Sequence, residues 1–134
     1  MTKWPVTPEA NEIIEAFEQS ECALLLGMTV TAAWDHGVRV EMDTAGKNGP
    51  SGVAHGGAVF TLADQAFGIA ANIGGTRQVA LSANIQYISP ATGVLEAVAE
   101  RVSGNGMCSV YRITVTSGEK LVAVFEGVGI SVGK

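Results

Sequence analysis

Residues 53–72, VAHGGAVFTLADQAFGIAAN, are the stretch that decides the fold. Between Ala58 and Ala71 the segment is apolar almost all round, apart from one carboxylate, Asp64, near its middle. A helix without a generous polar face must be buried on most sides, so we expect a long central helix around which a sheet curls. Asp64 would then lie in low-dielectric surroundings, where an unpaired carboxylate costs several kcal/mol or raises its pKa.

The segments around this helix predict an α+β fold. A first helix is expected to follow Thr7, its N-cap, and to end near Ser20. The Gly-rich residues 44–53 predict a loop that delivers the chain to the central helix. Alternating apolar residues and Gly-bearing turns predict six strands, the last four of them as an antiparallel meander: 27–34, 37–43, 79–89, 94–102, 108–116 and 121–131.

Length and composition restrict the function classes. The 134 residues, 47% of them hydrophobic, suit a single domain spanning 1–134. A net charge of −5 without basic runs argues against a nucleic-acid surface. Cys22 and Cys108 lack metal-ligand spacing, so we expect reduced core cysteines, no metal and no cofactor. The sequence shows neither a signal peptide nor a membrane-spanning run, which by default predicts a cytoplasmic protein.

Asp64 admits two interpretations. It either caps a neighbouring element or reaches a narrow solvated edge beside Gln65, or it is a general base or nucleophile tuned by desolvation. The preceding His55-Gly56-Gly57 favours chemistry, because the first N–H groups of a helix are unpaired and can donate to a developing oxyanion. The alternatives are close packing for the glycine pair and a capping or core role for His55.

The pattern H-G-G-A-x-F-x-L-A-D-x-A-F-x-x-A over residues 55–70 resembles the hotdog-fold acyl-CoA thioesterases, most closely the phenylacetic-acid-degradation group. The order of the elements and NIQYISPATG at 84–93 extend the resemblance over nearly the whole chain. The resemblance implies an antiparallel sheet wrapped around one long helix. It also implies hydrolysis of an acyl-CoA substrate to a free acid and coenzyme A, with the acyl group left open.

The resemblance also implies roles for individual residues. Asp64 would be the general base or the nucleophile, the Gly56 N–H would polarise the thioester carbonyl, and His55 would order the loop and the substrate. Gly57, beside Gly56 at the helix start, is a further candidate for substrate binding.

Two positions depart from the family pattern. Where the family has an amide six positions before the histidine, this chain has Gly49, so Asn48 replaces that amide through a one-residue bulge or the contact is missing. Gly68 stands where some relatives have a hydroxyl one turn after the acid. Ser82 is the candidate replacement that orients water, although it also fits an ordinary polar strand position.

Two other functions remain open. A non-catalytic acyl-CoA-binding module would need the tunnel but not Asp64. An acyl-thioester hydratase or dehydratase is the weaker alternative, since neither an HFPG-like loop nor a D-x-N-x-x-H element occurs in the chain.

Helix geometry predicts that the site needs two chains. Gly56 and Asp64 are eight residues apart, about 12 Å along a helix axis. One thioester carbonyl cannot meet both. Two antiparallel copies would bring Asp64 of one chain to Gly56 of the other, as a homodimer or a dimer of dimers with sites at the interface.

Overall fold

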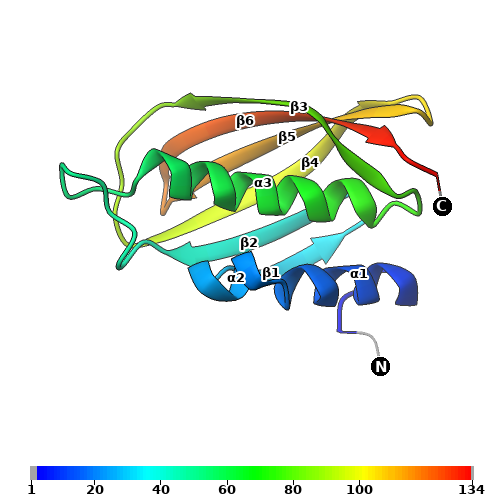
Figure 1. Ribbon diagram of the computed structural model, residues 1–134, viewed down its shortest axis with the longest axis horizontal. Helices are drawn as coiled ribbons and strands as arrows, with labels where there is room; N and C mark the ends of the chain where they lie inside the picture. The colour runs from blue at the N-terminus through cyan, green and yellow to red at the C-terminus, as the bar shows by residue number, and fades with distance from the viewer. Residues whose placement is uncertain (1–2, 134) are drawn as a thin grey trace.

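The computed structural model of this chain describes residues 3–133, in which six strands form one antiparallel sheet with a long helix across one face (Figure 1). The α+β arrangement predicted from the sequence is confirmed. The elements in chain order are α1 (Pro8–Glu18), α2 (Glu21–Leu26), β1 (Thr29–Trp34), β2 (Gly37–Asp43), α3 (Gly56–Asn72), β3 (Gln78–Tyr87), β4 (Val94–Gly104), β5 (Cys108–Ser117) and β6 (Lys120–Ser131).

The strand order is β1-β2-β4-β5-β6-β3, which corrects the predicted meander. β4, β5 and β6 are consecutive neighbours, but β3 lies at the far edge, where Ala83 pairs with Gly127 of β6. After β3, residues 88–93 carry the chain back across the sheet so that β4 can pair with β2. Turn residues mark where strands end. They do not say which strands become neighbours.

The core lies between the sheet and one side of α3. The Phe67 ring packs against Phe125 and Tyr111, with ring centroids 5.9 and 6.0 Å away. It also lies directly over Gly127 of β6, where a Cβ atom would come within 2.7 Å of the ring. The other side chains of α3 that are buried in this core are Val59, Leu62, Ala63, Ala66, Ile69, Ala70 and Ala71.

The N-terminal part contains a short helix that was not predicted from the sequence. As predicted, α1 begins after Thr7. The Thr7 hydroxyl accepts a hydrogen bond from the Ala10 N–H at 3.0 Å. The chain then forms the short helix α2, capped by Ser20 and closed by Gly27 in the left-handed region at φ 68°. Cys22 on α2 is exposed, so its predicted place in the core is wrong.

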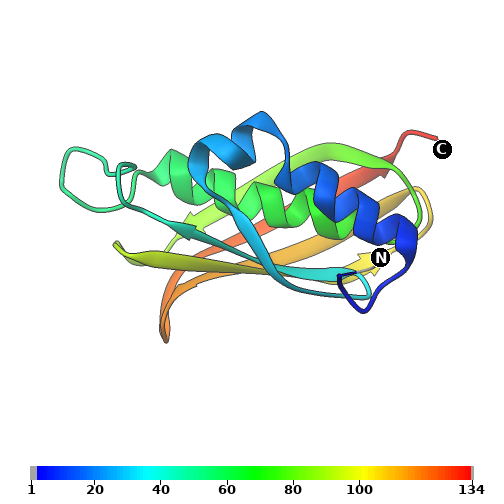
Figure 2. The ribbon, with the colours of Figure 1, turned by 90° about the horizontal axis from the view of Figure 1, so that it is seen from below.

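The outward side of α3 is only partly covered, as the view from below shows (Figure 2). α1 flanks the helix on the β1 side, where the Gln65 side chain donates to the Phe17 carbonyl at 3.1 Å. Gly57, Thr61 and Asp64 share the uncovered side of α3, which we call the outward stripe. Gly57 and Asp64 are exposed, and Thr61 is half-buried. The prediction of a buried Asp64 is therefore wrong for the single chain, because sheet and α1 together cover only part of the helix.

Candidate active site

The start of α3 presents one unused backbone donor. His55 is the N-cap, and its Nδ1 accepts a hydrogen bond from the Gly57 N–H at 2.8 Å. The neutral ring therefore carries its proton on Nε2, which turns a donor outward. Within residues 3–133 the Gly56 N–H makes no hydrogen bond, so it remains available at the positive end of the helix dipole.

A hollow of about 310 Å³ adjoins this helix start, and Gly56, Tyr87 and Ile88 help to line it. The Tyr87 hydroxyl donates to the Gly56 carbonyl oxygen at 3.0 Å. A Cβ atom at position 56 would lie 3.4 Å from the Tyr87 ring, in the space beside the free N–H. The absence of a side chain keeps this approach to the helix start open.

The carboxyl group of Asp64 stands on the outward stripe of α3, two turns beyond Gly56. Although the residue is exposed, the surrounding protein partly desolvates the carboxyl, and this burial raises its pKa above the ordinary value. A carboxylate of raised pKa is a better proton acceptor than an ordinary aspartate. About 12 Å of helix separates it from Gly56, so the two do not act on one carbonyl within a single chain.

The loop before α3 contains Asn48 and Gly49, the two positions at which a side chain could contact His55. Asn48 forms an isolated antiparallel bridge with Ala54, and the His55 N–H donates to the Lys47 carbonyl at 2.9 Å. A Cβ atom at Gly49 would lie 3.7 Å from Cδ2 of His55. A side chain at position 49 would therefore lie against His55, whereas Asn48 is exposed.

Ser82 lies on β3, paired with Val128, just after a bulge in the register between Ala80 and Ser82. Its side chain is exposed and forms no hydrogen bond among residues 3–133. The structure thus places Ser82 on the strand at the open edge of the sheet.

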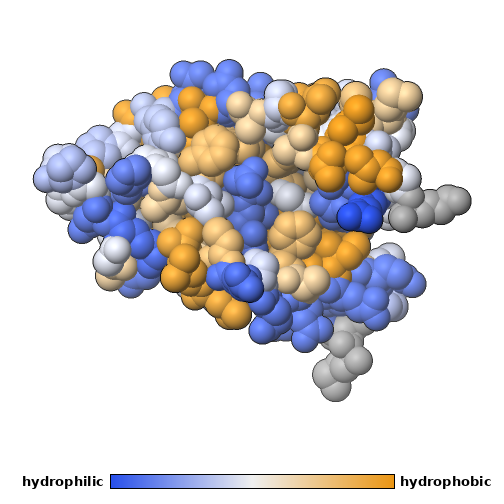
Figure 3. All heavy atoms as spheres, in the orientation of Figure 1, coloured by the Kyte–Doolittle hydropathy of each residue, from blue (hydrophilic) through white to orange (hydrophobic). Residues whose placement is uncertain are grey.

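Apolar side chains surround the outward stripe of α3 on two sides (Figure 3). On β3, Val79 is 48% exposed and Leu81 60%. On α2, Leu24 is 63% exposed and Leu25 82%. We call these four residues, together with the outward stripe of α3, the open face. An exposed apolar patch of this kind marks an interaction surface, a signal that sequence periodicity alone did not give.

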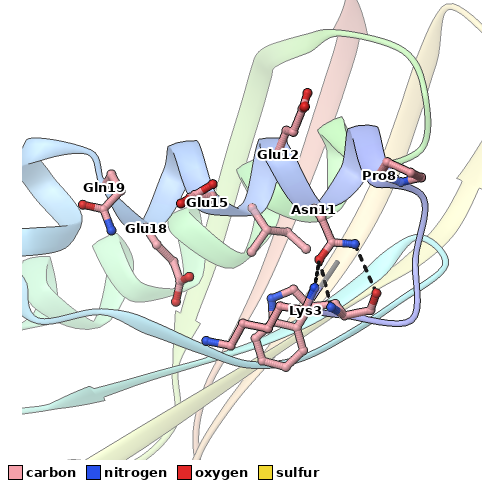
Figure 4. Close-up of a pocket in the computed structure, with 9 residues that line it drawn as sticks. Lys3, Pro8, Asn11, Glu12, Glu15, Glu18 and Gln19 are labelled. Carbon is pink, nitrogen blue, oxygen red and sulfur yellow. Dashed lines mark hydrogen bonds between the residues drawn. The ribbon is translucent and has the colours of Figure 1, made fainter. Parts of the chain in front are cut away.

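A second hollow, of about 390 Å³, lies on the outer side of α1 (Figure 4). The Asn11 side chain there accepts hydrogen bonds from the backbone N–H groups of Lys3 and Trp4 at 3.0 and 2.8 Å. These hydrogen bonds hold the N-terminal segment against α1, so we assign this hollow a structural role. Among residues 3–133, no helix is both long and apolar enough to cross a membrane.

The fold and the motif have known relatives. The profile of the thioesterase superfamily matches residues 51–124. The acyl-coenzyme A thioesterase PaaI of Escherichia coli K12 is 32% identical over 122 residues, covering 87% of this chain and 86% of that protein.

Solved structures of PaaI proteins are also similar to this chain. The structure of the E. coli PaaI protein superposes with a TM-score of 0.87 at 30% identity, over 93% of this chain and 94% of that one. A mutant of the phenylacetic acid degradation protein PaaI from Thermus thermophilus gives 0.81 at 33% identity, over 84% and 100%. The hotdog fold implied by the sequence is thereby confirmed.

Proposed function

The chain belongs to the thioesterase superfamily and is a thioester hydrolase, and we propose that it cleaves acyl- or aryl-CoA at a site formed by Gly56 and Asp64. One observation carries this assignment: α3 combines a free N–H group at its start with a partly desolvated carboxyl group on its exposed side. The first suits a developing oxyanion and the second suits an acceptor of the proton of water.

The reaction follows from these two groups. The Gly56 N–H donates to the carbonyl oxygen of the thioester, and Asp64 takes a proton from water as the water oxygen adds to the carbonyl carbon. The C–S bond then breaks, the sulfur leaves as thiolate and takes up a proton, and a free acid remains. In the nucleophilic variant, the Asp64 carboxylate itself adds to the carbon, and the C–S bond breaks as the thiolate leaves, which gives a mixed anhydride. Water then hydrolyses the anhydride to the free acid and regenerates the carboxylate.

Two chains complete the site in this proposal. The antiparallel pairing of two α3 helices sets Asp64 of one chain beside Gly56 of the other, and the two-fold axis makes two equivalent sites. The open face supports this arrangement, since its apolar side chains flank Asp64 on both sides. The assembly would be a homodimer or a dimer of dimers, and closure would desolvate Asp64 further.

The remaining candidates take supporting roles in this proposal. His55 holds the helix start through the Gly57 N–H and offers its Nε2 proton to the substrate. Gly57 contributes space beside the substrate, because its N–H is already engaged. Ser82 orients water from β3, and Asn48 contacts the substrate only through a rearrangement of its loop.

The test is thiol release from a panel of short-chain, long-chain and aryl acyl-CoAs, phenylacetyl-CoA included. We expect turnover with at least one class, and a loss of roughly 100-fold or more in Asp64→Asn, since the amide keeps the shape but not the base. Glu119→Gln, in the exposed turn before β6, is the matched control and should retain activity. Binding of acyl-CoA without any thiol release would support a binding module instead, and near-native turnover by Asp64→Asn would remove Asp64 from the mechanism.

A further inference from the structure

A groove of about 1180 Å³ lies at the C-terminal end of α3, beside α1. Its walls are contributed by α1, by the α3–β3 connection and by the start of β3. The apolar side chains that line it are Ile13, Ala16, Phe17, Ile73 and Val79. Concave, largely apolar hollows are typical of small-molecule sites.

Beyond the outward stripe, the same side of α3 continues from Asp64 to this groove. Residues three and four apart share one side of a helix, so Asp64, Gly68 and Asn72 follow one another along this side, and Asn72 lines the groove. Between them the Phe17 ring lies over Gly68, where a Cβ atom would come within 3.0 Å of the ring. Phe17 therefore stands one helical turn from the proposed reacting carboxylate and forms the near wall of the groove.

The charged residues around the groove argue against binding of the phosphate groups of coenzyme A there. Its ionised groups include Glu9 and Asp35 together with Arg77. Phosphates are recognised by clusters of arginine and lysine, and this mixed set, richer in acid, does not provide one. The apolar walls suit an uncharged hydrocarbon or aromatic group.

We propose that this groove holds the acyl group of the thioester, and that Ala16 and Phe17 of α1 limit its size. The inference rests on the proposed function and adds the place of the acyl group in this chain and the two residues that limit its length. In the two-chain site the reacting carbonyl lies between Asp64 and Gly56 of the other chain. The acyl group then extends from Asp64 toward the C-terminal end of α3, past Phe17.

Filling the groove tests this assignment. Ala16 is exposed, so Ala16→Trp places a large ring in the groove without disturbing the core. We expect kcat/KM for decanoyl-CoA to fall at least about tenfold, while acetyl-CoA stays within about twofold, because only the longer group needs the filled volume. Glu12→Trp, an exposed position on the outer side of α1, is the matched control and should change neither value.

Equal losses for acetyl-CoA and decanoyl-CoA would overturn the assignment, as would an unchanged profile. A binding measurement separates this outcome from failure of the proposed function. If no CoA ester is hydrolysed, calorimetry compares free coenzyme A with a non-hydrolysable decanoyl-CoA thioether. The groove assignment stands if Ala16→Trp abolishes the affinity gained from the decanoyl chain, and it fails if that gain persists.

Discussion

The two edges of the sheet differ in how their backbone is protected. At the β1 edge the Val30 N–H donates to the Glu18 carboxylate at 2.7 Å, and α1 packs beside the strand. At the β3 edge most side chains are exposed on both faces of the strand, and several of them are apolar. One edge is closed by the chain's own first helix, and the other is open.

This difference indicates where a second chain would dock. An unpaired edge strand is a template for pairing, and monomeric proteins blunt such edges with charges, bulges or covering elements. Glu18 and α1 protect β1 in this way, whereas β3 carries Leu81 and Val79 outward beside the α3 stripe that bears Asp64. The β3 edge has a bulge at Ala80 and Ser82 but no covering helix among residues 3–133. This uncovered edge adjoins the proposed chemistry, as a site shared between chains requires.

The largest effect is expected from breaking the open edge. Leu81→Asp would set two like charges near each other across a two-fold axis, so the assembly should dissociate and turnover should fall roughly 100-fold or more, because each site loses its oxyanion donor. Light scattering and thiol release measure the two effects. Thr29→Asp, at an exposed position of β1, is the matched control. An active, still oligomeric Leu81→Asp protein would contradict the role given to β3.

Mixing two inactive variants sharpens the same comparison. Asp64→Asn and Gly56→Val each disable every site of their own homodimer. Their heterodimer keeps one competent site, so random exchange should restore about a quarter of the wild-type sites. Thiol release is followed after subunit exchange has been verified by mass spectrometry. Exchange without any recovery would place both groups in one chain.

Breaking the contact that closes the β1 edge is expected to lower the stability of the fold. Glu18→Ala leaves the Val30 N–H without its protein acceptor, which is expected to lower the free energy of unfolding by about 1–3 kcal/mol. Urea denaturation measures the change, with Glu15→Ala, exposed on the same helix, as control. Oligomeric state should stay unchanged. If Glu18→Ala instead altered assembly, the β1 edge would also be an interface.

The smallest effect concerns the pH dependence of stability. Burial raises the pKa of Asp64, so the folded protein favours its neutral form, and the stability that this provides is lost as pH rises through the raised pKa. Asp64→Asn should therefore raise Tm at neutral pH and match the wild type below about pH 4, near the ordinary Asp pKa. Thermal melts across this range measure it, with Glu119→Gln controlling for net charge. Lower stability of Asp64→Asn at neutral pH would contradict the sign.

Local signals predicted much of the fold. The Thr7 cap located the start of α1, and alternation gave β2 its observed bounds. Helix α2 was missed because its six residues are too few to show periodicity, although Ser20 and Gly27 carried cap signals. The position of β3 beyond β6 depends on how α3 crosses the sheet, which no local pattern reports.

The helix start at the candidate site was predicted from the sequence, whereas the contacts around it were not. The sequence indicated a helix start at His55-Gly56-Gly57, and the structure has α3 begin there. That the Gly57 N–H is taken by His55 follows from a ring orientation that composition cannot give. The exposure of Asp64 likewise depends on which side of α3 the sheet and α1 cover.

The close contact of Phe67 with Gly127 limits how this sequence can diverge. Even an alanine at position 127 would place its methyl group against the ring, although the position lies outside the proposed site. A smaller residue at position 67 would make room for that methyl group but would leave a void in the core if it arose alone. Substitutions at positions 67 and 127 are therefore expected to be epistatic, because a change at one is tolerated only together with a compensating change at the other.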